Sequence, residues 1–240
     1  MNDRDTAPFW GAQTLAWYRR AADYGSYHRD LAALIAPHIP AGASVCDLGC
    51  GPGYLSLALL DHLPAVTALD RDQGALALLR TLGMGRQGLT IIDADAMALT
   101  PDQHWDCMVL SFFGRITVGD HLDYFMSHCD RLISVVNGGS RSSFSATGSS
   151  ARKKEYTPQV AAFLKEQGWH FTLEEHQLEF GQPLHDLEDA RAFVRRYSPP
   201  GVSTDDSDLT ARLQPLPEGG FYLPNTKRFG LFIIEKEASQ

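Results

Sequence analysis

A glycine-rich stretch at residues 45–54, Val-Cys-Asp-Leu-Gly-Cys-Gly-Pro-Gly-Tyr, carries the strongest chemical signal in this 240-residue sequence. Gly49, Gly51 and Gly53 allow positive φ and a close approach of backbone to a ligand, and a helix that follows them would offer unpaired N–H groups. The third glycine stands one position earlier than the dinucleotide pattern G-x-G-x-x-G requires. Asp47, just before the loop, would repel a diphosphate and attract a cationic or ammonium-bearing ligand. The stretch therefore favours a ligand without phosphate.

Two further acids follow the next apolar runs of the chain. Asp70 lies 19 residues after Gly51, the position from which a carboxylate accepts ribose hydroxyls. Asp95 follows the run at 89–92 and is placed to receive an amino group such as adenine N6. Each acid taken alone is typical of a cap or turn, and Asp93 competes with Asp95 for the role. Because the three acids stand at the ends of consecutive predicted strands, we predict that they form one binding site.

The elements that must position these acids alternate between two patterns. Short apolar runs predict strands at 44–48, 66–69, 89–92, 105–110 and 132–136, and helical spacing predicts helices at 54–62, 73–82 and 119–129. This alternation is typical of βαβ units, so we predict an α/β fold with a doubly wound, mostly parallel sheet covered on both faces. Because parallel strands bring their carboxyl ends to one edge, the ligand is expected there.

The rest of the chain is predicted to surround this core within a single domain of residues 1–240. The expected parts are an N-terminal helical cap at 1–39, a cofactor-binding core at 40–140 and a helical insertion that closes over the cleft at 181–226. A helix is predicted at 158–167, and long strands are predicted at 171–180 and 229–235. The N-terminal cap carries Tyr18, Tyr24 and Tyr27, which could contact a ligand cation, although core packing is the stronger interpretation.

The segments VCDLGCGPGYLSLAL, TALDRD, DADAMAL and WDCMVLSF resemble the class I S-adenosylmethionine-dependent methyltransferases, over roughly residues 40–137. The resemblance implies a Rossmann-like, seven-stranded sheet with an antiparallel last strand. It implies S-adenosylmethionine as the cofactor and S-adenosylhomocysteine as the product. The implied cofactor-binding residues are Asp47, Gly49, Cys50, Gly51, Gly53, Asp70, Arg71, Asp95, Ala96, Ser111 and Phe112.

The same resemblance implies a role for each part of this set. The three glycines bend around the methionine part of the cofactor, and Asp47 lies near its amino end. Asp70 holds the ribose, and Asp95 with the backbone of Ala96 holds the adenine. Ser111 and Phe112 line the methyl-transfer side.

Methyl transfer from a sulfonium is an in-line displacement, so the protein mainly supplies alignment and excludes water. A general base is needed only when the acceptor is a hydroxyl or a protonated amine. The candidates are His28, His121, His185, Asp186 and Tyr222, each of which is individually more typical of a surface or core residue.

The charges indicate what kind of acceptor to expect. A net charge of −8 disfavours nucleic acid, and Ser111-Phe112-Phe113-Gly114 differs from the Asp/Asn-Pro-Pro-aromatic signature of amino-methylating nucleic-acid enzymes. We therefore expect a small-molecule acceptor and no nucleic-acid partner. Residues 141–154 carry four cations and no acid, which suggests an anionic acceptor, with a solvated loop as the equal alternative. The candidate acceptor-binding residues are Arg141, Arg152, Arg195 and Lys227.

Composition sets the remaining expectations. No apolar run approaches the ~18 residues that span a bilayer, and no secretory signal is visible, so we expect a cytoplasmic protein with no membrane partner. Four cysteines form no disulfide framework, and no metal-ligand spacing is present. The oligomeric state is not indicated. Two alternative functions stay open: a catalytically silent protein of the methyltransferase fold, and a dinucleotide-dependent oxidoreductase, which the early third glycine disfavours.

Overall fold

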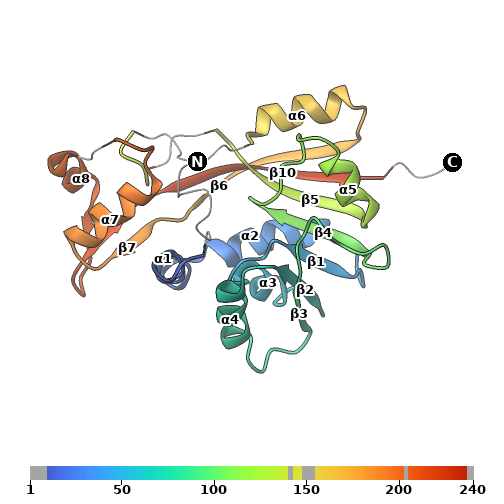
Figure 1. Ribbon diagram of the computed structural model, residues 1–240, viewed down its shortest axis with the longest axis horizontal. Helices are drawn as coiled ribbons and strands as arrows, with labels where there is room; N and C mark the ends of the chain where they lie inside the picture. Colours follow the sequence, from blue (N-terminus) through green and yellow to red (C-terminus); the bar gives the residue numbers. More distant parts are fainter. Residues whose placement is uncertain (1–9, 140–142, 148–154, 203–204, 237–240) are drawn as a thin grey trace.

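A seven-stranded sheet forms the centre of the computed structural model, which describes residues 10–139, 143–147, 155–202 and 205–236 (Figure 1). The strand order is β3-β2-β1-β4-β5-β10-β6. The strands are β1 (Val45–Leu48), β2 (Val66–Asp70), β3 (Leu89–Asp93), β4 (Trp105–Ser111), β5 (Cys129–Asn137), β6 (Phe171–Glu179) and β10 (Thr226–Glu235). Strands β1 to β5 pair in parallel, whereas β10 runs antiparallel to both β5 and β6. The predicted α/β fold with an antiparallel last strand is confirmed.

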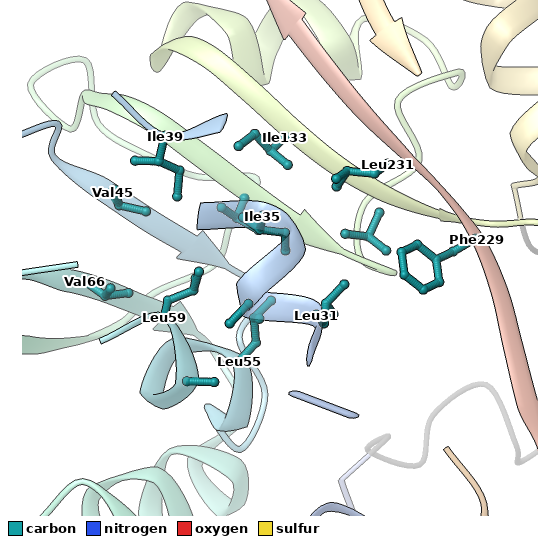
Figure 2. Close-up of a cluster of buried hydrophobic side chains, with 14 of the residues drawn as sticks. Leu31, Ile35, Ile39, Val45, Leu55, Leu59, Val66, Ile133, Phe229 and Leu231 are labelled. Atoms are coloured by element: carbon teal, nitrogen blue, oxygen red, sulfur yellow. The ribbon is translucent and has the colours of Figure 1, made fainter. Parts of the chain in front are cut away.

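Helices cover both faces of this sheet. The covering helices are α2 (Tyr27–Ile35), η1 (Ala36–His38), α3 (Tyr54–Leu59), α4 (Gln73–Leu82), α5 (His121–Ser127) and α6 (Thr157–Glu166). Figure 2 shows the core beneath α2 and α3, where Leu31 and Ile35 pack against Ile133 and Leu231. The opposite face is buried under α5 and α6. Burial on both sides explains why the inner strands β1, β4 and β5 contain continuous apolar runs, whereas the edge strand β6 alternates half-buried and exposed residues.

Helix α4 shows how the sequence fixes an element next to the site. Asp72 caps its first turn by accepting the Ala75 N–H at 3.0 Å. Leu76 and Leu79, at helical spacing, are fully buried and pack against Ala68 of β2. The helix therefore begins directly after the carboxyl end of β2, beside the glycine loop.

Residues 181–226 add a separate layer beyond one end of the main sheet (Figure 1). Its elements are β7 (Gln182–Leu184), α7 (Leu187–Tyr197), α8 (Asp206–Arg212), β8 (Gln214–Pro215) and β9 (Phe221–Leu223). The two helices agree with the helical character predicted for this insertion. The three strands form a small antiparallel sheet in the order β7-β9-β8, which the sequence did not indicate because runs of two or three residues show no period.

Helix α1 (Ala12–Tyr24) attaches this layer to the rest of the molecule. Trp17 is 4% exposed and packs edge-on against Phe193 of α7, with ring centroids 5.2 Å apart. Its indole N–H donates to Asp189 at 2.7 Å, and Arg20 bonds the same carboxylate at 2.9 Å. The N-terminal helix therefore belongs to the core of the insertion. No helix in the described residues is long and apolar enough to cross a membrane.

Candidate cofactor and acceptor site

The glycine loop joins β1 to α3 at the carboxyl edge of the sheet. Gly49, Gly51 and Gly53 have φ values of 72°, 54° and 74°, which L side chains rarely adopt. A Cβ on Gly51 would lie 2.8 Å from the indole of Trp10, and a Cβ on Gly53 would lie 2.2 Å from Leu79. Both conformation and space therefore require glycine. The indole of Trp10 lies beside Gly51, and this contact between residues about 40 positions apart was not predicted from the sequence.

Asp47 is the buried acid of the site. Asp47 is 2% exposed, and its Oδ2 accepts a hydrogen bond of 2.5 Å from the Ser56 hydroxyl. Burial raises the pKa of the Asp47 carboxyl to about 6, against the lowering effect of Ser56, and the charge of Asp70 raises it further. A carboxylate in this environment gains stability from a neighbouring cation. The surroundings of Asp47 fit the ammonium group that the resemblance places there.

Asp70 is tied directly to the glycine loop. Its Oδ2 accepts the Gly51 N–H at 2.7 Å, and its Oδ1 accepts the Asp72 N–H at 2.9 Å. Each carboxylate oxygen has a further lone pair for a hydroxyl donor. The carboxylate therefore shapes the loop and can still accept hydrogen bonds from a ribose.

The next strand end carries Asp95 beside a cation. Arg71 donates to its Oδ2 at 2.8 Å, and the Met97 N–H donates to its Oδ1 at 3.0 Å. The Met97 N–H and Arg71 hold the pKa of Asp95 below its usual value. Asp93, the competing acid, instead accepts a hydrogen bond from Gln73. Asp95 is thus held ionised at the sheet edge, although the fit to adenine stays a prediction.

The end of β4 is a strained turn. Phe112 has a φ of 53°, the one positive value at a non-glycine residue in the described part of the chain. Its N–H donates to the carbonyl of Val135 at 3.0 Å, which holds the turn against the sheet. Strain of this kind persists where the surroundings fix a side chain in a set position.

Lys227 places its ammonium among three aromatic rings at this point. The distance from Nζ to the ring centroid is 4.0 Å for Phe112, 5.2 Å for Phe180 and 5.3 Å for Tyr27. We call these three rings the aromatic cage. A residue predicted to bind the acceptor therefore lies against a residue predicted to line the methyl-transfer side.

His28 lies next to the aromatic cage in a buried polar pair. It is 6% exposed, and its Nε2 is 2.8 Å from the Tyr18 hydroxyl. Burial, helped by the charge of Lys227, lowers the pKa of His28 to about 3. Burial first and the charge of Asp47 second raise the pKa of Tyr18 above its ordinary value. Among the general-base candidates in the described residues, His28 is the one whose ring contacts the aromatic cage, at Tyr27 and Phe180, and it is neutral near pH 7.

The other sequence candidates have contacts of their own. His121 Nδ1 lies 3.0 Å from the carbonyl of Arg115. Tyr222 donates to Glu179 at 2.8 Å, and its ring tilts against Tyr24. His185 and Arg195 are exposed, Asp186 caps α7, and Arg141 and Arg152 lie outside the described residues. Ser111 pairs with Val135 in the sheet, and half-buried Cys50 keeps a thiol within the glycine loop.

Parts of the chain match known methyltransferases in sequence. Residues 45–134 match a family model described as a methyltransferase domain. Trans-aconitate 2-methyltransferase from Streptomyces coelicolor is 33% identical over 133 residues, which cover 53% of this chain and 43% of that protein. Ribosomal RNA small subunit methyltransferase A from Magnetococcus marinus is 41% identical over 59 residues, 25% of this chain and 21% of that protein. This chain thus spans less than half the length of these curated relatives.

Solved structures share the fold across most of the chain. The YcgJ protein from Bacillus subtilis aligns with a TM-score of 0.57 at 12% identity, covering 89% of this chain and 100% of that one. Magnesium protoporphyrin IX methyltransferase from Synechocystis, solved with bound S-adenosylmethionine, aligns with a TM-score of 0.53 at 13% identity, covering 96% and 86%. At these identities the likeness concerns the fold alone.

Proposed function

We propose that this chain, which carries an S-adenosylmethionine-dependent methyltransferase domain matched over residues 45–134, transfers a methyl group to a small, anionic molecule. One observation carries the proposal. The glycine loop, the buried Asp47 and the loop-bound Asp70 meet at the carboxyl edge of β1 and β2. This is where a parallel sheet of this kind binds its ligand.

The residues at this edge fit S-adenosylmethionine. Ionised Asp47 would attract the ammonium of the methionine part, and Asp70 would accept the ribose hydroxyls. Asp95 and the backbone of Ala96 would hold the adenine. The cofactor supplies a methyl group made electrophilic by the sulfonium to which it is attached. Trp10 and the aromatic cage would exclude water from this group and orient the acceptor toward it.

The acceptor class is supported by charge and by likeness. Lys227 brings a cation to the end of β4, whereas the net charge of the chain is −8, which disfavours broad binding to a phosphate backbone. Two relatives from Streptomyces are named for trans-aconitate, a small molecule. The ribosomal RNA methyltransferases resemble 25% of this chain. We therefore favour a small acceptor over RNA. We also propose that α1 and residues 181–226 form the cover of the cleft.

A ligand panel distinguishes the proposed cofactor from a dinucleotide. The melting temperature is measured with S-adenosylhomocysteine, with NAD⁺ and without ligand. We expect S-adenosylhomocysteine to raise it in proportion to ligand concentration and NAD⁺ to leave it unchanged. Asp61, an exposed acid paired with Arg86, provides the matched control: Asp61→Asn should retain the full shift and Asp70→Asn should lose most of it. A shift produced by NAD⁺ alone would favour the oxidoreductase.

A further inference from the structure

Glu155 is a buried acid that the proposed function does not use. The residue is 8% exposed and lies just before helix α6. Its Oε1 accepts the Thr117 N–H at 2.7 Å and also the Thr117 hydroxyl, and its Oε2 accepts the Ile116 N–H at 3.1 Å. Burying a carboxylate costs free energy unless hydrogen bonds compensate it, and here the donors all come from one loop. Glu155 is therefore bonded to the segment that follows β4.

The chain next to Glu155 is attached to the main sheet. Tyr156 forms a parallel bridge with Asn137, the last residue of β5, and the Thr157 hydroxyl donates to the Asn137 carbonyl at 3.1 Å. Helix α6 begins at Thr157, and its Val160 is fully buried in the core of that face of the sheet. The Glu155 carboxylate thus reaches the segment after β4 from a fixed support.

The segment that Glu155 holds carries two phenylalanines that face different parts of the site. We call residues 112–117 the β4 loop, because they follow β4 directly. Phe112 begins this loop with a φ of 53° and belongs to the aromatic cage. Phe113 contacts the glycine loop instead, since a Cβ on Gly49 would lie 2.2 Å from the Phe113 ring. The ring therefore lies directly against Gly49, and any side chain at that position would displace it.

The Phe113 ring lies beside the place where the proposed function puts the methionine part of the cofactor. Gly49 is the first residue after β1, at the start of the glycine loop that would bend around this part. A ring against Gly49 limits the space on that side of the loop and excludes water from it. The place of the ring depends on the course of the β4 loop, which is hydrogen-bonded to β5 at one end and to Glu155 at the other.

Apolar packing alone does not account for an acid at this position. Ile116 is fully buried, and its N–H is buried with it, so this donor needs an acceptor within the protein. An apolar side chain in place of Glu155 would remove the acceptor of both Ile116 and Thr117, which costs free energy and leaves the loop less firmly placed. Binding loops work when a fixed scaffold positions them, and the Glu155 carboxylate supplies that connection.

We propose that Glu155 is a positioning residue of the cofactor site, which holds the β4 loop so that the Phe113 ring stays against Gly49 and seats the methionine part of S-adenosylmethionine. This inference rests on the proposed function. Glu155 acts through Phe113 and does not itself contact the cofactor. Substitution of Glu155 therefore weakens ligands that contain the methionine part and spares ligands that lack it.

Two ligands measure this selectivity by calorimetry. S-adenosylhomocysteine contains the amino-acid part, whereas methylthioadenosine has the same adenosine and sulfur without it. We expect Glu155→Ala to weaken the binding of S-adenosylhomocysteine about tenfold and to leave the affinity for methylthioadenosine within about twofold. Glu155→Gln retains one acceptor oxygen and should recover part of the loss. An equal loss for both ligands, as a merely structural role would give, or no loss for either, would overturn the proposal.

Asp106 provides the matched control for Glu155. This exposed carboxylate also accepts a backbone N–H and a hydroxyl, both from Ser44 and both at 2.7 Å. The pair lies at the amino ends of β1 and β4, at the edge of the sheet opposite the glycine loop. Asp106→Ala should therefore leave the affinity for both ligands unchanged. A selective loss of S-adenosylhomocysteine binding in Asp106→Ala would overturn the assignment, because the loss would then not depend on the β4 loop.

Phe113→Leu tests the route through the ring, and it serves as the second variant if Glu155→Ala does not fold. It leaves the hydrogen bonds of Glu155 in place and should show the same selective loss. In the double variant of Glu155→Gln and Phe113→Leu, we expect no loss beyond that of Phe113→Leu alone, because Glu155 acts through the ring. Additive losses would contradict this route.

Two outcomes distinguish this proposal from the function on which it rests. If the wild-type protein binds S-adenosylhomocysteine and the variants show no selective loss, the role of Glu155 fails and the cofactor site stands. If the wild-type protein does not bind S-adenosylhomocysteine, the proposed methyl transfer fails as well.

Discussion

If Asp47 binds the cofactor's ammonium group as proposed, stability and cofactor affinity should respond to pH in opposite directions. Burial raises the pKa of the Asp47 carboxyl to about 6 from its ordinary value of 3.8, so folding without ligand favours the protonated form more than the unfolded chain does. Its contribution to stability is complete below the unfolded pKa and is lost as the pH rises through 6. The proposed contact with the cofactor's ammonium group needs the ionised form of Asp47, which is lost as the pH falls through the same range.

When the pH falls from 7 to 5, we expect the free energy of unfolding of the ligand-free wild-type protein to rise by about 1 kcal/mol relative to that of Asp47→Asn. Over the same range the affinity of the wild-type protein for S-adenosylhomocysteine should fall by up to about tenfold, whereas Asp47→Asn should bind weakly throughout. Urea unfolding and calorimetry at both pH values measure the two effects. Parallel changes in wild type and variant would show that Asp47 does not titrate as described.

Tyr27 gives a second prediction at the scale of one residue. Because its buried hydroxyl has no partner among the described residues, its removal should cost nothing and should relieve a desolvation penalty. We expect Tyr27→Phe to raise the free energy of unfolding by about 1 kcal/mol. Tyr54→Phe is the control, since the Tyr54 hydroxyl donates to Asp23 at 2.9 Å and its loss should lower stability slightly. Destabilisation by Tyr27→Phe, measured in urea, would indicate a partner for the hydroxyl.

Helix α1 links elements that are far apart in the chain. Trp17 and Arg20 bind Asp189 of α7, whereas Trp10, just before the helix, lies against Gly51 of the glycine loop. Tyr18, one residue after Trp17, faces His28. Helix α1 and the residue just before it thus contact both the insertion and the glycine loop, so the attachment of α1 should matter for the stability of the whole molecule.

Two substitutions at Trp17 measure that attachment. Trp17→Ala removes a fully packed side chain from the core of the insertion and should lower the free energy of unfolding by about 3–5 kcal/mol. Trp17→Phe retains the ring contact with Phe193 and loses the hydrogen bond to Asp189, so about 1–2 kcal/mol is expected. Both values come from urea unfolding. A loss below about 1 kcal/mol in Trp17→Ala would mean that α1 is not anchored in the insertion.

The elements differ in how well the sequence predicted them. The strands β1, β2, β4 and β5 were predicted because burial on both faces leaves apolar runs with turn residues at their ends, and β3 was predicted from its own short apolar run at the edge of the sheet. The small sheet of β7, β8 and β9 was missed because its strands have two or three residues. Strand β10 begins at Thr226, three residues before its apolar part, since Lys227 and Arg228 pair in the ladder without belonging to an apolar run.

The residues of the candidate site also differ in how well the sequence predicted their positions. Asp47 and Asp70 could be identified as site candidates because their residue type and their spacing from the glycines are visible in the sequence. The position of Lys227 over Phe112 depends on how β10 is inserted beside β5, and the spacing along the chain does not show it. The pairing of Tyr18 with His28 depends on the angle between α1 and α2. The sequence therefore indicated that Asp47 and Asp70 lie at one edge of the sheet, and their roles toward the cofactor stay predictions. It named the acceptor-side candidates without indicating which of them lie together.

At the scale of the whole molecule, the two halves of the site come from different parts of the chain. The acids of the cofactor side lie within residues 45–134, the range that matches the methyltransferase domain. The aromatic cage and Lys227 combine residues of α2, the end of β4, the end of β6 and β10, and three of these four segments lie outside that range. We therefore expect the cofactor to be shared with relatives of this domain and the acceptor to be particular to this chain.

The central claim is that the cofactor binds on the glycine loop against Asp70. Calorimetric titration of S-adenosylhomocysteine into the wild-type protein, Asp70→Ala and the surface control Asp61→Ala tests it most directly. We predict one site per chain in the wild type, an equal affinity in Asp61→Ala and a loss of at least about tenfold, or 1.4 kcal/mol, in Asp70→Ala. Absence of binding to the wild type, or an unchanged affinity in Asp70→Ala, would contradict the account.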